Sequence, residues 1–191
     1  MKQAQVLTKE EIRKVIKVCE LTRHEDRNKL IVHLSFLSGM RAIEIANLRV
    51  KDVLTADNKI LDVIALDKTQ TKGNKGQSIY VGKALKKELT KYFAKFPKLA
   101  DRKEGYLLRT QKGHFTSLTI QHLFKHLYAL ANIQNATSHS GRRSFITELS
   151  EKGVSVRVIQ ELARHSSLQT TQRYIDVSVP KLKGAVDLIG V

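Results

Sequence analysis

The sequence predicts an α+β protein that is mostly helical and carries one small antiparallel β-sheet or hairpin. Three observations lead to this fold class. Apolar residues recur at helical spacing through most of the 191-residue chain. Two short apolar and β-branched runs, 60–66 and 78–81, flank a turn sequence. A hydrophobic fraction of 41% is ordinary for a globular protein, and the length suits a single domain spanning 1–191, or at most two small ones.

The helices are predicted from apolar spacing together with start and stop signals. Thr8 and Glu11 have the spacing of a capping box, in which each satisfies a free amide of the other. Gly39 and Gly153 are expected to end two helices. The predicted helices cover 9–20, about 28–37, 41–48, 83–96, 116 or 117 to about 131, 142–152 and 155–163. A further short helix, beginning at 167 or 168, is expected to carry Tyr174.

The strands are predicted around a lysine-rich turn. Lys72-Gly73-Asn74-Lys75-Gly76 contains three residues that tolerate positive φ, so it is expected to join 60–66 and 78–81 as a hairpin. An earlier short strand near Val53 and another at 106–108 are also expected.

The charge balance indicates a polyanionic partner. The chain has 34 Lys and Arg against 18 Asp and Glu, a net charge of +16 and a pI near 10.0. DNA, RNA or an anionic membrane surface would all suit this charge, and a merely solvated basic face is the plain alternative. No apolar run approaches the length of a spanning helix, so membrane docking fits poorly. The single cysteine, Cys19, and the absence of a signal-peptide core predict a reducing cytoplasm.

Four segments, taken in order, resemble the tyrosine recombinase (phage integrase) family. They are 37–48 around Arg41, the lysine turn at 72–76, the His139-x-x-Arg142 box, and the stretch from His165 to Tyr174. The resemblance covers nearly the whole chain from about residue 7. One such box would be a weak signal, but four in the right order are specific.

The resemblance implies a set of catalytic residues. That set is Arg41, Lys72, His139, Arg142, His165 and Tyr174, with Glu44 in support. Tyr174 would attack a DNA phosphate and leave a 3′-phosphotyrosyl link with a free 5′-hydroxyl. Arg41 and Arg142 would bind the non-bridging oxygens, and Glu44 would orient Arg41. No metal, ATP or other cofactor is implied.

The chemistry of phosphodiester cleavage asks for these residue types. Forked guanidinium groups meet two phosphate oxygens at once, and they keep their charge at neutral pH. A phenol with an ordinary pKa near 10 is a poor nucleophile at pH 7 unless its proton is removed during attack. His139 can take that proton, and Lys72 on a hairpin can protonate the leaving 5′-oxygen.

Each residue also has a plainer explanation. A tyrosine on a short helix is more often core or interface, and Arg41 beside Glu44 is a common surface pair. His139 can be a helix cap, and Lys72 is typical of an exposed hairpin tip. Together these explanations do not account for the order and spacing of the boxes. Two rival functions remain open: a DNA-binding regulator that does not cut, and relaxation of supercoiled DNA by the same chemistry.

The expected partner is double-stranded DNA, bound by a tetramer that is a monomer or weak oligomer when free. The expected location is the cytoplasm, on the nucleoid of a prokaryote or on phage DNA. Candidate contacts with the DNA backbone are Lys68, Lys75, Arg109, Lys112, Arg143 and Arg164.

Three features depart from the family pattern or extend it. Gly141 and Arg143 stand where many members have an apolar residue and a histidine, and the glycine is expected to loosen its turn. The N-terminal core-binding domain of relatives is expected to be absent. The amphipathic tail 178–191 would dock on a neighbouring subunit in the family, although folding back onto its own domain suits the pattern equally.

Overall fold

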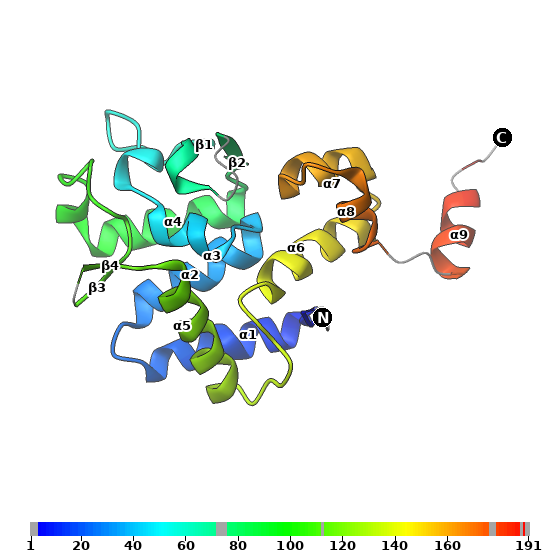
Figure 1. Ribbon diagram of the computed structural model, residues 1–191, viewed down its shortest axis with the longest axis horizontal. Coiled ribbons are helices and arrows are strands. Elements are labelled where there is room, and N and C mark those ends of the chain that lie inside the picture. Colours follow the sequence, from blue (N-terminus) through cyan, green and yellow to red (C-terminus); the bar gives the residue numbers. More distant parts are fainter. Residues whose placement is uncertain (1–3, 72–75, 112, 176–178, 188, 190–191) are drawn as a thin grey trace. The chain divides into compact units, whose positions relative to one another are not determined.

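The computed structural model describes residues 4–71, 76–111, 113–175, 179–187 and 189 (Figure 1). Most of these residues are helical and the strands are short and antiparallel, which confirms the predicted fold class. The chain divides into two compact units, Met1–Phe145 and Ile146–Val191. No helix within the described ranges is long and apolar enough to span a bilayer.

The helices of the first unit are α1 (Lys9–Val18), α2 (Glu25–Ser38), α3 (Ala42–Asn47), α4 (Lys83–Lys95) and α5 (Ser117–Leu130). Helix α6 (Ser140–Glu151) crosses the boundary, and α7 (Val156–Ala163), α8 (Leu168–Gln172) and α9 (Val179–Val186) follow it. Short 3₁₀ turns are η1 (Cys19–Leu21), η2 (Val50–Asp52), η3 (Lys68–Gln70) and η4 (Pro97–Leu99). The strands are β1 (Val63–Leu66), β2 (Gln77–Tyr80), β3 (Arg109–Thr110) and β4 (Gly113–His114).

The predicted start of α1 is confirmed, whereas α2 begins earlier than predicted. Thr8 Oγ1 accepts the Glu11 N–H at 3.2 Å, and Glu11 Oε2 accepts the Thr8 N–H at 2.8 Å, so the predicted capping box is confirmed. Helix α2 begins at Glu25, three residues before the predicted start. Glu25 and Asp26 form its first turn, where the helix dipole favours carboxylates, and such polar residues carry no apolar spacing from which a helix could be predicted.

The two strands of the predicted hairpin are paired, while residues 72–75 of its turn lie outside the described ranges. Strands β1 and β2 pair antiparallel, with Val63 opposite Tyr80 and Leu66 opposite Gln77. Burial alternates along β1, and its inward residues join the core. The short strand expected near residue 53 is only an isolated bridge between Leu54 and Ile60.

The strand predicted at 106–108 is wrong. Tyr106 makes only an isolated bridge with Arg49, and the N–H of Leu107 donates to the carbonyl of Leu48 at 2.8 Å. Leu107 and Leu108 are buried, but they lie in a bend of the chain and form no strand pairing. The paired residues, β3 and β4, come later, in a polar stretch that carries no apolar alternation.

Helix α2 is the centre of the first unit (Figure 1). Its residues Leu30, Ile31, Val32 and Leu34 are all buried although they point to different sides of the helix. Helix α4 packs against it, while α5 packs against both α1 and α3. A central helix is a rigid support, so the residues that follow its C-terminus are held firmly. In the second unit α7 packs against α8.

Candidate active site

The turn after α2 requires glycine. Gly39 has φ 62° and ψ 25°, in the left-handed region, and its N–H donates to the carbonyl of Ser35 at 3.1 Å. A Cβ at this position would lie 2.7 Å from the ring of Phe145. The turn brings the chain directly to Arg41, which stands before the first turn of α3.

Arg41 is held by a buried carboxylate. Its Nη1 donates to Glu44 Oε1 at 2.7 Å, and its backbone N–H donates to Glu44 Oε2 at 2.8 Å. The Glu44 side chain is fully buried, whereas that of Arg41 is 20% exposed. A buried carboxylate without a cationic partner is costly, so this pair fixes the guanidinium in place. Gln77 Oε1, from β2, accepts from the same Nη1 at 3.4 Å.

Arg142 reaches the same turn from α6. It is 5% exposed, and its Nη1 donates to the carbonyl of Gly39 at 2.8 Å, across 103 positions of sequence. That carbonyl lies only two residues before Arg41. The fold therefore gathers two guanidinium groups around one backbone turn, and like charges so placed favour an anion between them.

The start of α6 is capped just ahead of Arg142. Ser140 Oγ accepts the N–H of Thr137 at 3.0 Å, and Thr137 Oγ1 accepts the N–H of His139 at 3.2 Å. His139 is exposed there, three residues before Arg142. Gly141 does not loosen this turn as expected. A Cβ on Gly141 would lie 2.1 Å from Ser35 Oγ, so the glycine lets α6 pass close to α2.

The N-terminal segment also packs against α6. Arg143 Nη1 donates to the carbonyl of Ala4 at 2.8 Å, and the N–H of Leu7 donates to Ser144 Oγ at 2.8 Å. Arg143 is half-buried, so much of its side chain serves this packing. Its contact with DNA stays a prediction.

The second unit brings His165 and Tyr174 together. Helix α7 ends at Ala163, and the φ of 56° at the following residue, Arg164, turns the chain back. The ring of His165 then stacks on that of Tyr174. Their centroids are 5.6 Å apart at an interplanar angle of 21°. His165 Nδ1 lies 2.9 Å from Thr171 Oγ1. Tyr174 is half-buried and lies two residues beyond the end of α8, so α8 is shorter than predicted.

The remaining predicted residues are on the surface or outside the described ranges. Lys72, Lys75 and Lys112 lie outside the described residues. Lys68 in η3 and Arg109 in β3 are exposed, and Arg164 is half-buried with its Nη1 donating to the carbonyl of Leu162 at 2.9 Å. Just before the lysine turn, Gln70 is buried and its Nε2 donates to the carbonyl of Asn47 at 2.9 Å.

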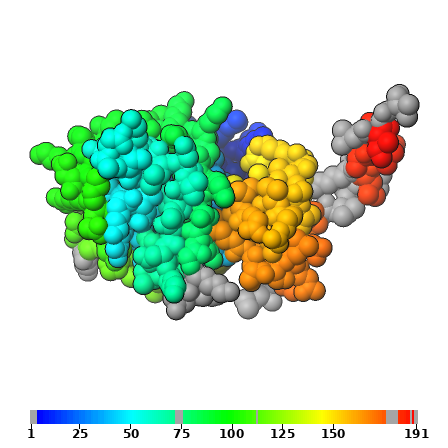
Figure 2. Space-filling model, turned by 90° about the horizontal axis from the view of Figure 1, so that it is seen from above, coloured from blue at the N-terminus to red at the C-terminus, as the bar shows by residue number. Residues whose placement is uncertain are grey.

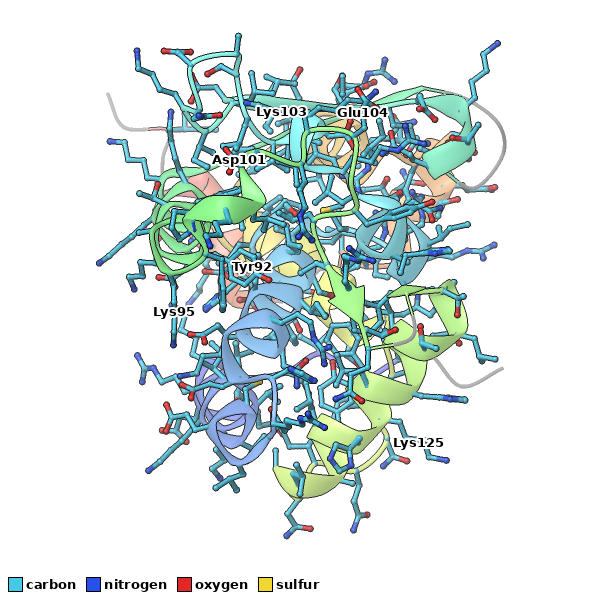
Figure 3. All side chains as sticks on the ribbon, turned by 90° about the vertical axis from the view of Figure 1, so that its left-hand side faces the viewer. Tyr92, Lys95, Asp101, Lys103, Glu104 and Lys125 are labelled. Atoms are coloured by element: carbon cyan, nitrogen blue, oxygen red, sulfur yellow. The ribbon has the colours of Figure 1, made fainter. Side chains whose placement is uncertain are left out.

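A groove of about 810 Å³ lies at the N-terminal end of α2. It is lined by Arg27, Tyr92 and Lys95, among others, and Figure 3 labels the last two. Lys95 pairs with Asp26 at 2.7 Å, and burial raises the pKa of Tyr92. A 14-residue helix is about 21 Å long. The groove is thus far from the arginines at the other end of α2 and is not the candidate active site.

The sequence profile of the phage integrase family matches residues 5–180. The chain belongs to this family. It is 35% identical to the tyrosine recombinase XerA of Thermococcus kodakarensis over 182 residues, which cover 94% of this chain and 60% of the relative. The tyrosine recombinase XerD of Rickettsia bellii is 29% identical over 193 residues, which cover 95% of this chain and 63% of the relative. The chain thus spans about 60% of the length of these relatives.

Solved structures agree with the phage integrase fold. The crystal structure of a XerA recombinase matches 97% of this chain and 66% of its own with a TM-score of 0.74 and 24% identity. The Tn1549 transposon integrase, solved in complex with circular intermediate DNA, matches all of this chain and 68% of its own, with a TM-score of 0.72 and 17% identity. At these identities the likeness establishes the fold alone.

Several contacts in this phage integrase domain have no signal in the sequence. Gly39 is recognisable only as a helix end, yet its carbonyl binds Arg142. Gln77 is a single polar residue with no periodic pattern around it, and its partner Arg41 comes from another segment. Thr171 lies in the stretch from His165 to Tyr174, but the sequence does not show that its side chain meets that of His165. Such contacts become visible only when the backbone path is known.

Proposed function

We propose that this phage integrase family member is a site-specific DNA recombinase. It cleaves and rejoins double-stranded DNA through a covalent 3′-phosphotyrosyl intermediate, with neither metal nor ATP. The observation that carries the proposal is the turn at Gly39, where Arg142 donates to the carbonyl two residues before Arg41. Paired guanidiniums at one point suit the two non-bridging oxygens of a phosphodiester.

In the proposed reaction Tyr174 Oη attacks the scissile phosphorus. His139 accepts the phenolic proton, the bond from phosphorus to the 5′-oxygen breaks, and Lys72 protonates that leaving oxygen. Arg41 and Arg142 stabilise the charge that develops on the non-bridging oxygens, while His165 donates a further hydrogen bond. Rejoining reverses these steps, because the phosphotyrosyl bond conserves the energy of the broken linkage.

Glu44 supports this site through Arg41. Its buried carboxylate binds both the guanidinium and the backbone N–H of Arg41, so the guanidinium is oriented before DNA arrives. Preorganised charge of this kind stabilises the charge that develops in the transition state, which is usually the largest single contribution to catalysis.

A suicide duplex with a nick beside the cleavage point tests the nucleophile. Wild-type protein should form an adduct with DNA that survives denaturant, and Tyr174→Phe should form none. Tyr80→Phe is the matched control, because Tyr80 is an exposed tyrosine on β2 outside the proposed set. An adduct retained by Tyr174→Phe would reject the assignment. DNA binding by wild type without any adduct would favour a regulator, and topoisomers without recombined product would favour supercoil relaxation.

The two arginines are tested with the same substrate. Arg41→Ala and Arg142→Ala should each slow adduct formation by about 10²-fold or more while much of the DNA binding remains. Arg102→Ala, at an exposed arginine outside the set, should cleave normally. Near-normal cleavage by either Arg41→Ala or Arg142→Ala would show that the phosphate is bound elsewhere.

We also propose that four copies act on paired duplexes, with the free protein a monomer or weak oligomer. The tail 178–191 would dock on a neighbouring subunit; in support, Leu182 and Val186 of α9 (red in Figure 2) are 56% and 67% exposed. Light scattering with and without DNA tests the stoichiometry.

The proposed contacts with the DNA backbone are Lys68, Lys75, Arg109, Lys112, Arg143 and Arg164. The proposed location is the cytoplasm, on nucleoid DNA.

A further inference from the structure

The backbone of His165 is clamped by one glutamine. The N–H of His165 donates to the carbonyl of Gln160 at 3.1 Å, and Gln160 Nε2 donates back to the carbonyl of His165 at 3.1 Å. Gln160 is 6% exposed, and its Oε1 accepts from Arg157 Nη1 at 2.9 Å. These bonds hold the Cα of His165 in place, but they do not decide how its ring is turned.

The ring of His165 contacts the hydroxyl of Thr171. A histidine ring that flips about χ2 exchanges its carbon and nitrogen edges, so an unsupported ring presents no fixed donor. Here Thr171 Oγ1 lies 2.9 Å from Nδ1, and Thr171 is fully buried in α8. Stacking on Tyr174 restricts the tilt of the same ring. With Nδ1 directed at Thr171, Nε2 is the nitrogen that can meet a phosphate oxygen.

We propose that Thr171 is a positioning residue that holds His165 with a hydrogen on Nε2 for the scissile phosphate. The inference rests on the proposed function, in which His165 donates to that phosphate. Non-bridging phosphate oxygens of a diester only accept hydrogen bonds, so the facing nitrogen must carry hydrogen. A hydroxyl serves both charge states of the ring, because it donates to Nδ1 of the neutral ring and accepts from Nδ1–H of the cation.

The chain offers closely matched variants. Thr171→Val keeps the shape of a buried side chain and removes only the hydroxyl, whereas Thr171→Ser keeps the hydroxyl. Thr170→Val makes the same chemical change one residue earlier, at a half-buried position outside the proposed machinery. Duplex binding and the unfolding midpoint should be the same for Thr171→Val and wild type, so a change in rate would not reflect misfolding.

Adduct formation on the nicked duplex in a single turnover is the first measurement. Thr171→Val should be slower by about 10-fold or more, the lower end of the effect seen when the hydrogen bond that orients a metal-binding histidine is removed. Thr171→Ser should recover most of the rate, and Thr170→Val should match wild type. A wild-type rate in Thr171→Val, or no recovery in Thr171→Ser, would overturn the inference.

The ring tautomer is the second measurement and needs no activity. Long-range ¹H–¹⁵N correlation spectra report which ring nitrogen carries hydrogen, and the signal of His165 is the one lost in His165→Asn. Neutral wild-type rings should be in the Nε2–H form, and Thr171→Val should show a mixture of both forms. A wild-type ring in the Nδ1–H form, or a tautomer unchanged in Thr171→Val, would overturn the inference.

The two measurements separate the failure of this inference from that of the proposed function. If wild type forms no adduct, or Tyr174→Phe retains it, the recombinase proposal fails, and the tautomer still decides whether Thr171 orients His165. If wild type forms the adduct and Thr171→Val is equally fast, only the role of Thr171 fails.

Discussion

At Gly141 the contact between α6 and α2 leaves no room for a side chain. An added Cβ would lie 2.1 Å from Ser35 Oγ and 2.9 Å from Ser35 Cβ, and both belong to a fully buried residue. Ser35 Oγ has no hydrogen-bond partner anywhere in the described parts of the chain. The Ser35 hydroxyl therefore fills space at this contact but makes no hydrogen bond that would offset the cost of its burial.

Gly141→Ala should lower the free energy of unfolding in urea by about 1–3 kcal/mol, because overpacking forces α6 and α2 apart. It should also slow cleavage, since Arg142 is the next residue. Gly184→Ala is the control, as nothing lies within 4 Å of a Cβ there. Ser35→Ala alone should be neutral or stabilising, and it should recover part of the loss in the double variant. Strictly additive effects would show that the two residues do not meet.

Single residues also show which parts of the site can be predicted from the sequence. The arginine boxes could be identified because Arg41 and Arg142 occur in motifs with fixed spacing, and their common junction at Gly39 supports that identification. The roles of the six predicted residues stay predictions. Gln77 could not be identified, because a bond between side chains of different elements leaves no periodic trace in the sequence. Thr171 lies in the box from His165 to Tyr174, but a box does not say which of its side chains meet.

Among the elements, helices were predictable and short polar strands were not. Dense apolar residues correctly indicated that α2 is buried, but the acidic first turn of α2 hid its start. The pair of β3 and β4 was missed because it is two residues long on each side and polar. The pairing of β3 with β4 depends on the path of the backbone. That path is fixed by Leu107 and Leu108, which are buried just before β3.

The packing of α2 against α4 makes stability depend on pH through His33. His33 Nε2 lies 3.8 Å from Glu88 Oε2, and burial is the main cause that lowers the pKa of His33, with Lys91 and Lys29 acting in the same direction. The fold thus favours the neutral ring, and the unfolded chain binds the proton more tightly. Stability is therefore full above the unfolded pKa of about 6.5 and falls as the pH drops towards the lower folded pKa.

His33→Gln should flatten this acid-side loss, because it removes the group whose protonation the fold opposes. Urea unfolding at pH values on both sides of about 6.5 measures the slope. His122→Gln, at an exposed histidine on α5, is the control and should keep the wild-type slope. If His33→Gln loses stability with acid as steeply as wild type, another group is responsible.

At the scale of the whole molecule, the net charge of +16 should make the proposed binding to DNA depend on salt. Figure 3 shows Lys125 at the surface, where it is exposed, and charge of this kind acts on any duplex whatever its sequence. Each phosphate contact contributes about −0.9 to the slope of log affinity against log salt. The charge was readable from composition, whereas the point at which the chain divides into two compact units, after Phe145, was not.

Lys75→Ala and Lys112→Ala should each weaken binding to unrelated duplexes alike and make the salt slope shallower by about 1. Fluorescence anisotropy over a salt series measures both quantities. Lys59→Ala is the control, because Lys59 is already paired with Asp57 at 2.7 Å. A slope that stays at the wild-type value would remove the mutated lysine from the DNA-binding surface.

The left-handed turn at Gly39 constrains two segments that are distant in the sequence, the one around Arg41 and the one around Arg142. A side chain there would meet both an unfavourable φ and the ring of Phe145, and it would shift the carbonyl that Arg142 grips as well as the path to Arg41. In a randomised library selected for cleavage, this codon should therefore remain glycine even where every neighbour varies. Substitutions that change the preferred DNA target would therefore have to lie outside this turn, because the backbone at Gly39 sets the spacing of Arg41 and Arg142.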